Sequence, residues 1–152
     1  MDYKIFGLPT HVLVIHLVVV GIPVAALATV GMAVRPPWRS GRIAMVIVGV
    51  DALAVVGTYI ARLTGLAFYK SWPNFSQLKP VVDHKNLGLT LIWYMLGLLA
   101  AAILLVLAEK YERPPLTTIF AVIAAAAAVA AVVQTIRVGD AGARATWSGY
   151  IR

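Results

Sequence analysis

Four long apolar stretches, at residues 10–34, 43–68, 87–108 and 116–136, make up most of this 152-residue chain. Each is long enough to cross a bilayer as an α-helix, which takes about 20 mainly apolar residues. Of the thirteen basic and six acidic residues, only Asp51 and Arg62 fall within one of these stretches. The pattern predicts an all-α integral membrane protein with four spanning helices.

The composition supports a membrane protein and excludes several other classes. Hydrophobic residues make up 61% of the chain, which is too apolar for a soluble domain of this length. The four stretches and their connections leave no room for a soluble catalytic domain, so we expect that the chain is not an enzyme. The net charge of +7 lies on residues that flank the stretches, where basic side chains meet anionic lipid head groups. We therefore expect the lipid bilayer as a partner, and no nucleic acid.

The positions of proline and the short connections predict how the helices follow one another. Seven of the eight prolines lie outside or at the edge of an apolar stretch, and Pro23 alone should kink the first helix. The connections after the first and third stretches are short, so consecutive helices should be antiparallel neighbours. The alanine run at 124–128 should allow close helix packing. We predict one domain, residues 1–152, folded as an up-down-up-down four-helix bundle with both termini on the same side.

The second stretch carries a polar stripe. Asp51, Val55, Thr58, Arg62 and Gly65 follow the spacing that places residues on one face of a helix. Polar groups are unfavourable in lipid, so this face should turn to the bundle interior. In one interpretation Arg62 extends to the membrane interface and Asp51 is a neutral or hydrogen-bonded carboxyl. In the other, the stripe is a proton or ion path through Asp51.

Most of the remaining polar residues should meet at one end of the bundle, where a site is expected. From their depth in the stretches, His16, His84, Arg62 and Gln134 are the predicted contacts of a small ligand or cofactor. Arg62 would hold an anionic group there. An outer rim would be formed by His11, Asp83, Asp140 and Arg144. Alternatively, Arg62 pairs with Asp83 or Asp140 and locks the bundle end without any ligand.

The chemistry of this end is limited by the residue types present. No catalytic or metal residues are assigned, because no nucleophile triad, phosphate loop or dinucleotide motif occurs. Neutral imidazoles can bind haem iron between helices, so a haem b held by His16 and His84 is geometrically conceivable. The chain contains no cysteine, which excludes disulfides and thiolate ligands.

Several segments resemble a bacterial family of predicted four-helix membrane proteins of unknown function. The first helix of that family typically begins His-Pro-x-x-Val-His-Phe-Pro, and this chain has GLPTHVLVIHLVVVGIP, with Val12 at the position of the first proline. The similarity continues through the Asp51 region, DHKNLGLTLIW and GDAGARATW. Asp140 stands where the family often has histidine. Members are sometimes joined to Rieske iron–sulfur domains, so the resemblance implies a redox neighbourhood.

From these observations we interpret the chain as a non-catalytic accessory subunit of a larger bacterial membrane assembly, for example a respiratory one, with other membrane subunits as partners. The alternatives are a haem b- or quinone-binding redox bundle and the path through Asp51. The expected location is the bacterial inner (plasma) membrane. Eight basic residues lie on the side of the termini and five on the other, which favours cytoplasmic termini.

Overall fold

Long helices dominate the computed structural model, which describes residues 4–5 and 7–147. Within these residues the long helices are α1 (Thr10–Val34), α2 (Gly41–Ser71), α4 (Lys79–Lys110) and α5 (Pro114–Trp147). Each of the four is long and apolar enough to cross a membrane. The all-α membrane bundle predicted from the sequence is confirmed.

Short elements occupy the chain between and before the long helices. A small antiparallel hairpin is formed by β1 (Lys4–Ile5) and β2 (Leu8–Pro9), with Lys4 opposite Pro9. One turn of 3-10 helix, η1 (Pro36–Trp38), follows α1, and the single turn α3 (Pro73–Ser76) joins α2 to α4. These connections are short, so each long helix returns beside the one before it.

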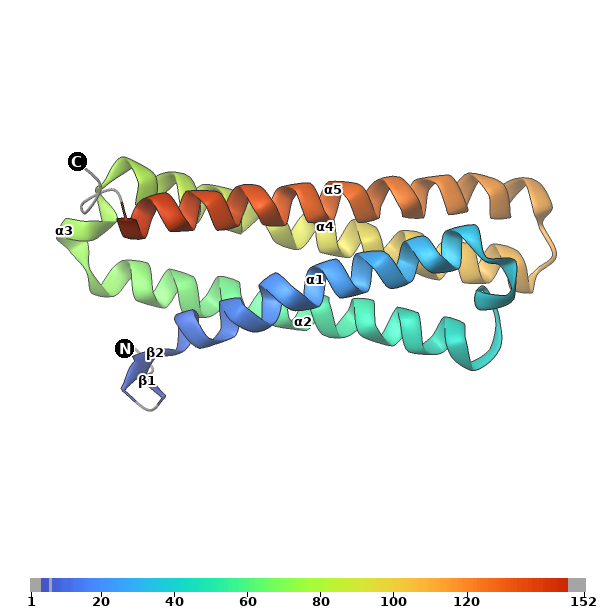
Figure 1. Ribbon diagram of the computed structural model, residues 1–152, viewed down its shortest axis with the longest axis horizontal. Helices are drawn as coiled ribbons and strands as arrows, with labels where there is room; N and C mark the ends of the chain where they lie inside the picture. Colours follow the sequence, from blue (N-terminus) through green and yellow to red (C-terminus); the bar gives the residue numbers. More distant parts are fainter. Residues whose placement is uncertain (1–3, 6, 148–152) are drawn as a thin grey trace.

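The long helices form a ring in which α1 contacts α2, α2 contacts α4, α4 contacts α5 and α5 contacts α1. Consecutive helices run in opposite directions, and α1 begins at the end of the bundle where α5 ends (Figure 1). We call this the histidine end, because His11 and His84 lie there, and the opposite end the loop end. The helices α1 and α4 lie on a diagonal of the ring and touch little.

Two helices, α4 and α5, continue well beyond the apolar stretches in the sequence, and α2 extends two or three residues past its stretch at each end. With 34 residues, α5 is about 51 Å long, whereas the hydrocarbon core of a bilayer is about 30 Å thick. Proline marks the ends more closely than hydropathy does. Trp72 precedes Pro73 and stops α2, Pro80 lies in the first turn of α4, and α5 begins at Pro114. The helices therefore extend out of the lipid, and the histidine end includes these outer turns.

The interior is filled by two apolar clusters, one in each half of the bundle. The cluster nearer the histidine end centres on Ile22, Met95 and Leu98, and the one nearer the loop end centres on Met32 and Leu105. Ala124 and Ala128 are fully buried, as expected for an alanine face that lets helices approach closely. Large apolar side chains such as Leu17, Met45 and Leu53 lie on the outside, where they contact lipid.

Arg39 closes the loop end. Its guanidinium donates hydrogen bonds to the carbonyls of Met32 (3.2 Å) and Ala33 (2.6 Å), which are among the last carbonyls of α1 and have no partner inside the helix. The same guanidinium lies 3.6 Å from the Glu109 carboxylate at the end of α4. This contact therefore caps α1 and connects it to the far side of the bundle.

Candidate functional site

His11 lies in the first turn of α1 and reaches across to α2. Its Nδ1 donates to the carbonyl of Ala61 (3.2 Å), and its ring stacks on Phe68 with centroids 6.3 Å apart and planes at 22°. Because a carbonyl can only accept, the bond to Ala61 assigns the proton to Nδ1; Thr64 Oγ1, 3.4 Å from the same nitrogen, donates to carbonyls of its own helix. This tautomer leaves the lone pair on Nε2.

His84 repeats the same construction between α4 and α5. Its Nδ1 donates to the carbonyl of Val138 at 2.9 Å. Four residues after each acceptor carbonyl comes a glycine, Gly65 in α2 and Gly142 in α5, and each imidazole lies against that glycine. A Cβ at Gly65 would come within 2.9 Å of His11 Cε1, and a Cβ at Gly142 within 3.0 Å of His84 Cε1. Each ring therefore has room to lie where it does because the neighbouring helix has a glycine, without a side chain, at that position.

The two imidazoles meet across the diagonal of the bundle. Their centroids are 6.3 Å apart and their planes make an angle of 65°. Both rings are half-buried, and among the described residues no partner is recorded for either Nε2. Two imidazoles that bind one metal ion from opposite sides, with nitrogen–metal bonds of about 2.0 Å, place their centroids about 6 Å apart. The centroid spacing of this pair is close to that value.

The structure brings His84 together with His11 and not with His16. His16 is exposed on the other side of α1, and its Nδ1 donates to the carbonyl of Val12 in its own helix (2.6 Å). The two positions differ by five residues, or about 140° around the helix, so only one of them can face the interior at this end. His11, expected at the rim, occupies the central position instead.

The predicted partners Arg62 and Gln134 both bind the backbone of α4 one to two turns beyond His84. Arg62 Nη1 donates to the carbonyl of Leu89 at 3.4 Å. Gln134 is 2% exposed, and its amide donates to the carbonyl of Leu87 (3.1 Å) and to Thr90 Oγ1 (2.9 Å). These side chains form a polar layer on the membrane side of the histidine pair.

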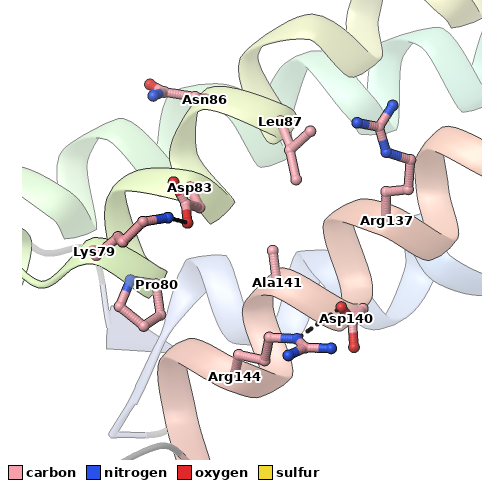
Figure 2. A pocket seen from close by; sticks show the side chains of 9 residues that line it. All are labelled: Lys79, Pro80, Asp83, Asn86, Leu87, Arg137, Asp140, Ala141 and Arg144. Atoms are coloured by element: carbon pink, nitrogen blue, oxygen red, sulfur yellow. Dashed lines mark hydrogen bonds and ion pairs between the residues drawn. The ribbon is translucent and has the colours of Figure 1, made fainter.

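The rim residues form local ion pairs. Asp83 accepts from Lys79 at 2.6 Å, and Asp140 accepts from Arg144 at 2.9 Å. The alternative pairing of Arg62 with either aspartate is therefore not observed. The pairs stand on either side of a groove of about 680 Å³ between α4 and α5, which Arg137 also lines (Figure 2).

The two imidazoles can hold a metal ion only if most of its ligands come from a cofactor and not from the protein. Within the described residues, no three His, Cys, Asp or Glu side chains gather closely enough to hold a metal ion. The porphyrin of a haem supplies most of the ligands of its iron, so two imidazoles would be enough to hold it. The hydrogen bond from each Nδ1 to a carbonyl is the second interaction that metal-binding histidines usually make.

Comparison with known sequences identifies a protein family for this chain. The profile of a family described as predicted membrane protein (DUF2231) matches residues 7–152. The chain belongs to this family. No curated protein and no solved structure matches it. The membership agrees with the resemblance noted in the sequence and with the four candidate membrane helices among the described residues.

Proposed function

We propose that this DUF2231 protein is a haem-binding electron carrier of the bacterial plasma membrane, in which His11 and His84 would hold the haem iron. The observation that carries the proposal is the pair of diagonal imidazoles, 6.3 Å apart, each with Nδ1 bound to a carbonyl. Haem bound between two histidines exchanges single electrons without any substrate at the iron. The chain would therefore act as a carrier and not as an enzyme.

The residues around the pair would orient it and balance its charge. The bonds to Ala61 and Val138 hold each ring so that its Nε2 is free to bind iron. Arg62 donates one N–H group to the carbonyl of Leu89. Its other guanidinium N–H groups would bind an anionic group such as a propionate. This retains the role expected for Arg62 from the sequence.

An electron carrier needs a donor and an acceptor, which supports the interpretation as a subunit of a larger membrane assembly. Nearly all described residues belong to the spanning helices and their short connections. We therefore propose other membrane subunits as electron partners, in an assembly of respiratory type. The count of basic residues would place the termini in the cytoplasm.

Substitution of each histidine tests the proposal. The purified full chain, produced with haem supplied, should show a Soret band that is lost in both His11→Ala and His84→Ala. His16→Ala is the matched control and should keep the band, because His16 faces away from the pair. Circular dichroism would confirm that all variants remain helical. A colourless wild-type preparation after haem loading, or loss of the band in His16→Ala alone, would contradict the proposal.

A further inference from the structure

A second polar site lies deep in the bundle, away from the histidine pair. The Asp51 side chain is completely buried, and its Oδ2 accepts a hydrogen bond from Thr29 Oγ1 at 2.7 Å. Within the part of the chain that the structure describes, Asp51 Oδ1 is the one buried side-chain oxygen or nitrogen without a hydrogen-bond partner. One oxygen of this buried carboxyl is therefore hydrogen-bonded, and the other has no hydrogen-bond partner among the described residues.

No cation lies at the depth of Asp51. On α2 the nearest basic residues are Arg42 and Arg62, about 14 Å and 16 Å away along the axis. The other helices carry their histidines and charged groups towards their ends: His11 and His16 on α1, Lys79, Asp83, His84, Lys85, Glu109 and Lys110 on α4, and Arg137, Asp140 and Arg144 on α5. Tyr94, in the middle of α4, is also titratable; its side chain is 37% exposed and has no charge to pair with a carboxylate. An ionised Asp51 would therefore be an unpaired charge inside a membrane protein, which is strongly unfavourable. A proton on the carboxyl would remove this charge.

On the inner face of α2, polar residues continue from Asp51 towards the histidine end and not towards the loop end. Thr58 lies seven residues further along the same face, about 10 Å towards the histidine end, and is 2% exposed. Arg62 follows one turn later, and Gly65 lies against the His11 ring. Towards the loop end, the same face of α2 carries the buried apolar residues Ile47 and Ala44. The Thr58 hydroxyl donates to the carbonyl of Ala54 (2.8 Å) and can still accept a hydrogen bond, so a short chain of waters on this face would link it to Asp51 Oδ1.

We infer that Asp51 is a proton-binding site in the bundle interior, and that it exchanges its proton with the histidine end along the polar face of α2 through Thr58. The ligand is the proton itself, bound as the neutral carboxylic acid. Thr29 orients the carboxyl, and Oδ1 faces the exchanging water. The inference does not depend on haem, because it rests on the carboxyl, its missing partner and the polar face alone.

Infrared spectroscopy of the full chain in proteoliposomes tests the site. At neutral pH the wild-type protein should show the C=O band of a protonated carboxyl, which Asp51→Asn removes and Asp83→Asn leaves unchanged. Thr29→Val should shift the band without removing it, because only the hydrogen bond to Oδ2 is lost. Absence of the band in the wild type, or its survival in Asp51→Asn, would overturn the assignment.

The route is tested by the rate at which this band shifts after transfer to D₂O. Thr58→Val should slow the exchange about tenfold, the effect of losing one hydrogen-bonding step. Thr117→Val is the matched control: Thr117 is also a buried threonine bound to its own helix, but it lies at the loop end. A band that does not exchange over hours, or equal slowing by both variants, would overturn the route.

Discussion

Each imidazole of the pair is positioned by a hydrogen bond and by a glycine. The carbonyls of Ala61 and Val138 fix the rotation of the rings, and Gly65 and Gly142 provide the space in which they lie. Because glycine is unfavourable inside a helix by about 1 kcal/mol relative to alanine, its use here suggests that space matters more than helix propensity.

Two glycines of α5, three residues apart, allow this to be measured. Gly142→Ala should destabilise the protein by about 1 kcal/mol or more, because the new methyl group would meet the His84 ring and overpacking outweighs the gain in helix propensity. Gly139→Ala should stabilise it by up to about 1 kcal/mol, because nothing lies within 4 Å of the new Cβ. Thermal unfolding in detergent compares them; equal effects of the two substitutions would show that the ring does not rest on Gly142.

The sequence predicts which end of the bundle carries the polar residues, and the polar face of α2, but not which histidine of α1 faces inward. The region around positions 11 and 16 is apolar on all sides, so no amphipathic pattern fixes the rotation of α1 about its axis. The rotation is set by contacts with other helices, such as the packing of His11 against Gly65, 54 positions away, and the hydrogen bond from Thr29 to Asp51. Long-range contacts of this kind are not encoded in local spacing.

At the scale of the elements, the apolar stretches predict where the helices are but not where they end. Hydropathy places the end of the fourth helix at residue 136, yet α5 continues to Trp147, because a helix need not stop where the lipid does. The first connection behaves differently. Arg39 binds the last carbonyls of α1 and approaches Glu109, so a turn that looks like an ordinary charged loop closes one end of the bundle.

Removing this cap should weaken the fold. Arg39→Gln should lower the free energy of unfolding by about 2 kcal/mol, because two charge-assisted hydrogen bonds to carbonyls are lost. Arg42→Gln is the control, since Arg42 is exposed at the start of α2. Denaturant unfolding in mixed micelles gives both values. If Arg42→Gln were as damaging as Arg39→Gln, the effect would come from total charge and not from the cap.

At the scale of the whole molecule, the bundle consists of two hairpins, and each contributes one histidine. The α1–α2 hairpin holds His11 against Gly65, and the α4–α5 hairpin holds His84 against Gly142. A metal centre bound by both imidazoles would therefore join the two halves at the histidine end. The site exists only when the hairpins are packed together, which explains why no single segment of the sequence reveals it.

The electron paramagnetic resonance spectrum of the ferric protein, recorded after loading the purified full chain with haem, tests the central claim most directly. Iron held by two imidazoles is expected to be low-spin, at one haem per chain, and the low-spin signal should disappear in His11→Ala and in His84→Ala. A high-spin signal in the wild type, or no bound haem at all, would contradict the proposal that His11 and His84 together hold the haem.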